Sequence, residues 1–167
     1  MTLGILILAL VTLERLAELP WARANTRRLL AAGGREVGSG HYPAIVALHA
    51  FWLAALWVLA PGRLLHFAWL ALFILIEIGR AWVLATLGRR WTTRIIVVPG
   101  EVLVRRGPYR FVDHPNYLVV AAEIAVLPLV FGLWPVALLF TLANAVILWV
   151  RVRMENAALR SDRSRSS

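Results

Sequence analysis

The sequence contains no cysteine and no lysine, and it has few charged residues of any kind. Without cysteine the chain has no disulfide, no thiolate metal site and no thiol nucleophile. Its four histidines lack the spacings that place two metal ligands on one helix face, which argues against metal catalysis. Charged residues make up only 16% of the 167 residues, well below the share typical of soluble domains.

Apolar residues dominate instead, at 60% of the composition with a mean hydropathy of +0.73. This composition predicts an integral membrane protein. Five apolar runs approach the length of a bilayer-spanning helix, at 2–19, 44–60, 64–87, 117–131 and 134–150. We therefore expect an all-α protein with five transmembrane helices. Residues 1–160 should form one domain, and the Ser/Arg-rich segment 161–167 should be a disordered tail.

The basic residues, all of them arginine, gather on one side of the predicted helices. Fifteen of the 18 fall in the first connection, the third connection and the tail, whereas the second connection holds only Arg63. The positive-inside rule then places the N-terminus outside, and the C-terminus and the third connection in the cytoplasm. The net charge of +9 favours lipid headgroups or an anionic ligand over nucleic acid as partners.

The third connection is too long and too unusual in composition to be a passive link. Short β-branched or apolar stretches at 95–98 and 101–104 flank Pro99-Gly100 and predict a small β-hairpin at the membrane surface. The stretch GPYRFVDHPNYL at 107–118 follows. Pro115 suits the first position of the fourth helix, and it holds the preceding residue out of helical geometry.

The start of the fourth helix predicts an anion site. Free backbone N–H groups and the positive end of the helix dipole favour a carboxylate or a phosphate there. Arg105, Arg106, Arg110 and His114 supply further donors. For Arg105 and Arg106, simple contact with lipid headgroups is the alternative.

The end of the fifth helix carries two oppositely charged residues that can form a pair. Arg151 and Glu155 are four residues apart, so their side chains share a helix face and can interact. An ordinary surface ion pair is one interpretation. The other is a functional one, because this helix end and the start of the fourth helix converge on the same side of the membrane.

Several polar residues interrupt the apolar runs, namely Glu77, Arg80, Glu123 and Asn144. Each is costly in hydrocarbon unless it is paired or faces a cavity. Pairing of Arg80 with Glu77, Glu14 or Glu18 between helices is one account. A functional site within the bundle is the other.

The stretch 107–117, the helical hairpin after it and Arg151-Val152-Arg153-Met154-Glu155 together resemble the isoprenylcysteine carboxyl methyltransferase family of membrane methyltransferases. This core motif region spans 95–159. The family typically shows Gly-x-Tyr, Arg-His-Pro-x-Tyr and Arg-x-x-x-Glu-Glu. Asp113 departs from the arginine of the second motif, and Asn156 replaces the second glutamate of the third.

The resemblance implies an enzyme that uses S-adenosylmethionine to methylate an oxygen of a lipophilic membrane-embedded acceptor. Upstream stretches at 14–18, 35–38 and 41–43 are similar to a bacterial branch linked to alkylpyrone and alkylresorcinol lipids, which places the enzyme in the bacterial inner membrane. By position, Arg151 and Glu155 are implied as catalytic residues, with Arg151 near the acceptor. The implied cofactor residues are Glu101, Val102, Leu103, Val104, Tyr109, His114, Pro115, Asn116, Tyr117 and Glu155.

Other functions stay open at this point. A phospholipid N-methyltransferase is a near alternative, with prenylated-protein carboxyl methylation a less favoured substrate class. A transporter-like protein could use Glu77, Arg80 and Glu123 as a pathway, although no inverted repeat is visible. A membrane reductase using NADPH is a third alternative. Cofactor binding separates these possibilities.

Overall fold

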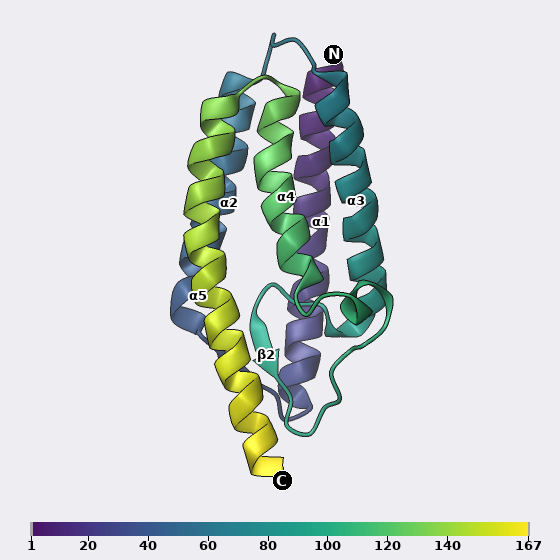
Figure 1. The fold of residues 1–167 in the computed structure, drawn as a ribbon, viewed down its shortest axis with the longest axis vertical. Coiled ribbons are helices and arrows are strands. Elements are labelled where there is room, and N and C mark those ends of the chain that lie inside the picture. Colours follow the sequence, from purple (N-terminus) through teal and green to yellow (C-terminus); the bar gives the residue numbers. More distant parts are fainter. Residues whose placement is uncertain (1, 167) are drawn as a thin grey trace.

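Five α helices and a small two-stranded sheet make up the computed structural model, which describes residues 2–166 (Figure 1). The helices are α1 (Leu3–Ala31), α2 (Tyr42–Leu59), α3 (Phe67–Leu87), α4 (Pro115–Val130) and α5 (Trp134–Ser166). They lie side by side along the long axis, with the two chain ends at opposite ends of the bundle. The sheet (β1, Arg35–Val37; β2, Ile95–Val97) and the long loop after it gather at the C-terminal end.

The prediction of a helical membrane protein agrees with this architecture. Three segments in the described part of the chain are long and apolar enough to cross a membrane, namely Ser39–Leu59, Phe67–Arg90 and Trp134–Ala158. Helix α4 is apolar but shorter, and its 16 residues correspond to about 24 Å of helix. Helix α1 carries charged residues in its apolar half, and these require partners inside the bundle.

Two helices extend well beyond the predicted apolar runs. Helix α1 continues past Pro20 to Ala31, so three arginines assigned to the first connection lie on this helix. Helix α5 continues through Ser166, whereas segment 161–167 was predicted to be a disordered tail. The difference arises because hydropathy detects only the part of a helix that lies in hydrocarbon, while intrahelical hydrogen bonding continues into water.

The predicted hairpin between 95–98 and 101–104 is wrong. Strand β2 instead pairs antiparallel with β1 from the first connection, with Glu36 opposite Ile96. The sheet packs against the end of α5, where Val37, Ile95, Val97, Met154 and Ala158 form a small apolar cluster. Burial against α5 fixes this pairing, and three residues of mixed polarity are too few to reveal β1 as a strand from the sequence.

Helix α4 is the central helix of the bundle. It packs against α3 on one side and α5 on the other, and it buries Ile124, Leu127 and Val130. Pro115 begins the helix as predicted, after His114 in a non-helical conformation (φ −128°, ψ 59°). A tight turn with Gly132 at φ 68° then leads into α5, which confirms the predicted helical hairpin.

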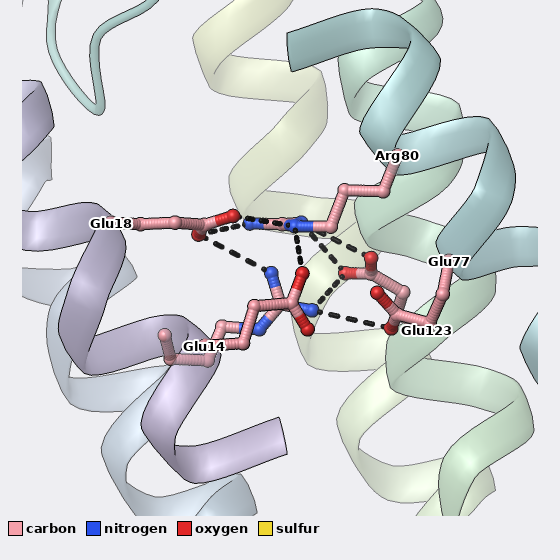
Figure 2. Close-up of polar contacts among 6 residues, drawn as sticks. Glu14, Glu18, Glu77, Arg80 and Glu123 are labelled. Atoms are coloured by element: carbon pink, nitrogen blue, oxygen red, sulfur yellow. Dashed lines mark hydrogen bonds and ion pairs between the residues drawn. The ribbon is translucent and has the colours of Figure 1, made fainter. Parts of the chain in front are cut away.

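Six charged side chains from α1, α3 and α4 meet inside this bundle (Figure 2). Arg80 Nε donates to Glu18 Oε1 at 2.8 Å, and Arg80 Nη1 lies 3.0 and 3.1 Å from the two Glu123 carboxylate oxygens. Only 4% of Arg80 and 3% of Glu123 is exposed. The predicted pairing of Arg80 between helices is confirmed for Glu18 and for Glu14, which lies 3.5 Å away, whereas the third predicted partner, Glu77, pairs with Arg15 instead.

Arg15 of α1 joins the same network from the other side. Its Nη2 lies 3.1 Å from Glu123 Oε2 and 3.5 Å from Glu77 Oε1, and its Nη1 lies 3.5 Å from Glu18 Oε2. The two arginines therefore tie α1 to α3 and α4. Because an unpaired charge in hydrocarbon is costly, these contacts hold α1 in place and support a structural role for this network.

Candidate functional site

A pocket of about 520 Å³ lies at the end of the bundle where α4 begins and the sheet packs on α5. Its lining includes the predicted site residues Glu101, Val102, Leu103, Val104, Tyr109, His114, Asn116, Tyr117, Arg151 and Glu155. Pro115 is not part of the lining, and its role is to begin α4. The fold thus brings together residues from the long loop, the first turn of α4 and the second half of α5.

Tyr117 links the two predicted catalytic residues. Its hydroxyl accepts a hydrogen bond from Arg151 Nε at 2.8 Å and donates to Glu155 Oε2. Arg151 and Glu155 share a face of α5 as predicted, and the Tyr117 hydroxyl lies between them as a bridge. Arg151 is 6% exposed, so its guanidinium is held by the protein and does not behave as a headgroup anchor.

His114 approaches the same Glu155 oxygen as the Tyr117 hydroxyl. Its ring stacks on Tyr117 with centroids 5.3 Å apart and planes at 17°. His114 Nδ1 lies 3.6 Å from Glu155 Oε2, and His114 Nε2 lies 3.2 Å from Asn156 Oδ1. Asn156, one of the two departures from the family motif, therefore holds the imidazole through its side-chain oxygen.

Tyr109 enters the pocket from the 3₁₀ helix η3 (Gly107–Arg110). Gly107 has φ 56°, and a Cβ there would lie 2.4 Å from Thr86 Oγ1, so only glycine allows this close approach to α3. Burial, followed by the negative charge of Glu155, raises the pKa of Tyr109. Tyr109 therefore remains a neutral phenol that is able to donate a hydrogen bond.

The first connection of the chain supports the far wall of the pocket. Arg94 lines the pocket, donates to Glu36 at 2.8 Å and lies over the Tyr42 ring at 4.4 Å. The Tyr42 hydroxyl lies 3.2 Å from Thr93 Oγ1, and the Thr93 carbonyl accepts from Arg151 Nη2 at 2.9 Å. Arg151 is thus held between α4 and a loop that the first connection positions.

The predicted anion donors divide between different places. Arg105 and His114 line the pocket, whereas Arg106 does not, and Arg110 lies over the Phe111 ring with its guanidinium carbon 4.4 Å from the centroid. Sequence reasoning missed several lining residues, namely Arg90, Trp91, Arg94 and Arg160. In the sequence, Arg90 and Arg94 served only as evidence for the orientation of the helices in the membrane. Nothing in the local sequence shows that β2 pairs with β1, which brings this part of the chain to the pocket.

The isoprenylcysteine carboxyl methyltransferase (ICMT) family matches residues 69–161, which include α4 and the residues that line the pocket. YpbQ of Bacillus subtilis (strain 168), described as an uncharacterized protein, is 39% identical over 160 residues, covering 93% of this chain and 95% of that protein. No solved structure matches the chain. The resemblance inferred from the motifs is therefore confirmed, and the chain belongs to the isoprenylcysteine carboxyl methyltransferase family of membrane methyltransferases.

Proposed function

We propose that the protein is an S-adenosylmethionine-dependent methyltransferase that methylates an oxygen atom of a lipophilic acceptor. The observation that carries this proposal is the junction at Tyr117, whose hydroxyl joins Arg151 to Glu155 in a polar pocket at the end of an apolar bundle. A water-soluble cofactor and a membrane-embedded acceptor require such a boundary. Methyltransferases of this family generally use S-adenosylmethionine.

The residues of the pocket fit that cofactor. Its volume of about 520 Å³ lies within the range of small-molecule sites. Arg105 and His114 suit the carboxylate of the methionine part, and the Glu155 carboxylate suits a positive sulfonium.

Asp113 adds a negative charge to this lining where the family has an arginine. Arg90, Arg94 and Arg160 also line the pocket. They supply positive charge in place of the arginine that is absent at position 113. Arg90 pairs with Glu101 at 2.7 Å and Arg94 pairs with Glu36, so both are already oriented by carboxylates. The pocket therefore retains an excess of positive charge despite Asp113.

When bound, S-adenosylmethionine supplies a methyl group whose bond to sulfur breaks as a bond to the acceptor oxygen forms. The protein residues position this oxygen and exclude water, which accounts for much of the acceleration in a reaction without a covalent enzyme intermediate. Arg151, fixed by Tyr117 and Thr93, orients an anionic oxygen. A carboxylate or an acidic enol needs no base, whereas a phenol would transfer its proton to Glu155 or His114.

An alkylpyrone-type lipid is the acceptor class that we favour, because its enol ionises near neutral pH and its alkyl chain partitions into the bilayer. We also propose that all five helices cross the inner membrane of a bacterium, with the pocket on the cytoplasmic side. The arginine distribution supports this orientation. The charge network supports insertion of α1, because its charged residues have partners in α3 and α4.

Replacing Glu155 or His114 with alanine is expected to weaken S-adenosylmethionine binding at least tenfold, about 1.4 kcal/mol. Glu155→Ala removes the carboxylate that Tyr117 and His114 share, and His114→Ala removes the stacked ring and its contact with Asn156. Calorimetric titration of each variant in lipid nanodiscs, with S-adenosylhomocysteine as a second ligand, measures the change.

His66→Ala is the matched control, because His66 lies beside Val130 and Gly132 at the turn between α4 and α5 and does not line the pocket. NADPH serves as the control ligand and should not bind. Wild-type affinity in both the Glu155 and His114 variants would exclude this pocket as the cofactor site. Saturable binding of NADPH alone would favour a reductase instead.

A further inference from the structure

A second pocket, of about 590 Å³, lies at the end of α3 next to the candidate methyltransferase pocket. Two adjacent pairs of arginines line it. Arg89 and Arg90 come from the 3₁₀ helix η2 (Gly88–Arg90) that follows α3, and Arg105 and Arg106 come from the long loop before η3. The fold therefore brings together two arginine pairs that are well separated in sequence.

This group of arginines keeps an excess of positive charge. Within residues 2–166, Glu101 is the carboxylate at ion-pair distance from the group, with its Oε1 2.7 Å from Arg90 Nη2. All four arginines have exposed side chains at the mouth of the pocket. An anion that enters this pocket would meet several guanidinium groups and a single competing carboxylate.

The carbonyl groups at the end of α3 would repel an anion if they were free, because a helix C-terminus carries partial negative charge. One carbonyl of α3 and two of η2 already accept hydrogen bonds. Asn25 of α1 donates to the Gly88 carbonyl at 3.1 Å, Arg28 donates to the Arg89 carbonyl at 3.3 Å, and Arg106 Nη2 lies 3.5 Å from the Thr86 carbonyl. These contacts reduce the number of free acceptors next to the arginines.

The pocket also has an apolar rim at the level where a membrane surface would lie. It sits at the end of Phe67–Arg90, one of the segments long and apolar enough to cross a bilayer. Val102 and Leu103 line it and are 80% and 40% exposed. Guanidinium groups bind phosphate oxygens in pairs, and an adjacent apolar rim suits the glycerol and first methylene groups of a lipid.

We propose that this basic pocket binds the phosphate group of an anionic phospholipid. Val102, Leu103, Val104 and Arg105 form a wall shared by both pockets. A lipid held there would contact the same residues that line the methyltransferase pocket. The lipid site itself rests on the arginines and the membrane position, and it stands whether or not the neighbouring pocket binds S-adenosylmethionine.

The test uses a variant that leaves the methyltransferase pocket untouched. Arg89 and Arg106 line the basic pocket and not its neighbour, so the double substitution Arg89→Gln/Arg106→Gln removes two cations from this site alone. Arg153→Gln is the control, because Arg153 lies over the Trp149 ring on α5, outside both pockets. Native mass spectrometry of the protein in nonionic detergent counts bound lipid during titration with phosphatidylglycerol, phosphatidylcholine or inorganic phosphate.

Wild-type protein and Arg153→Gln are expected to bind phosphatidylglycerol at least tenfold more tightly than phosphatidylcholine, and the double variant is expected to lose this preference. Binding of inorganic phosphate with the same sensitivity to the variant would keep the phosphate site but assign it to a free anion. Equal binding of the two lipids by the wild type, or equal losses in the double variant and the control, would overturn the proposal. Equal binding of the two lipids by the wild type is measured without any variant, so this outcome does not depend on how the double variant folds.

Discussion

Replacing Arg80 with methionine should lower the free energy of unfolding by about 3–5 kcal/mol, the cost of removing one partner from a buried ion pair. Arg80 contacts Glu18 and Glu123, and both it and Glu123 are almost fully buried. Methionine replaces the aliphatic part of the arginine side chain but has no charge, so these carboxylates would lose their main cation. Unfolding by sodium dodecyl sulfate in mixed micelles, followed by circular dichroism, measures the change.

The pairing itself is tested by the double variant Arg80→Met/Glu123→Gln. Removing both charges should restore part of the lost stability, because Glu123, the most buried carboxylate of the network, is then neutral and no longer needs Arg80. Arg63→Met, in the exposed connection between α2 and α3, is the control and should change stability little. An Arg80→Met protein as stable as this control would show that the network does not hold α1 to α3 and α4.

Replacing Arg151 with lysine should lower kcat for methyl transfer by about 100-fold. This is the usual effect of losing one group that stabilises negative charge on a reacting oxygen atom. Lysine keeps the positive charge but cannot donate to both the Tyr117 hydroxyl and the Thr93 carbonyl as the guanidinium does. S-adenosylmethionine affinity should change less than threefold, because Glu155 and His114 remain. Steady-state methyl transfer into lipid acceptors, combined with calorimetry, separates the two effects.

Arg153→Lys is the matched control for this substitution, since Arg153 is two residues away on α5 and lies over Trp149. It should retain turnover. If Arg151→Lys lost affinity in proportion to turnover, Arg151 would belong to the cofactor site. If turnover were unchanged, Arg151 would have no part in holding the acceptor.

Local sequence signals predicted the parts of the fold that depend on local physics. Pro115 and the residue before it marked the start of α4, because proline restricts the backbone wherever it occurs. Apolar run length predicted the five helices but not their ends. The four-residue spacing of Arg151 and Glu155 correctly predicted a shared helix face.

Long-range contacts could not be predicted in the same way. Strand β1 is short and pairs with β2 from a distant part of the chain, so the pattern of 35–37 alone gave no signal. The place of Arg94 in the pocket could not be predicted for the same reason, because it depends on contacts with Glu36 and Tyr42. Arg15 was also missed as a partner of Glu123, since pairing across helices depends on their packing.

The departure at Asn156 acquires a physical explanation only from the structure. Its side-chain oxygen lies 3.2 Å from His114 Nε2. A glutamate at position 156 would place a second carboxylate beside Glu155, whereas the asparagine amide is neutral. The sequence showed only that an acid was absent. The structure shows that the imidazole keeps a partner there and that Glu155 faces Tyr117 and His114.

Methyl transfer into lipid is a direct test of the proposed methyltransferase activity. Purified protein in nanodiscs containing bacterial lipid extract would be incubated with S-adenosylmethionine labelled in its methyl group, alongside Arg151→Lys and Glu155→Ala. We expect label in the organic phase, one S-adenosylhomocysteine formed for each methyl group transferred, and strong reduction in both variants. Folded wild-type protein that neither binds S-adenosylmethionine nor transfers label, across extracts that contain alkylpyrone and other acidic lipids, would contradict the proposed activity.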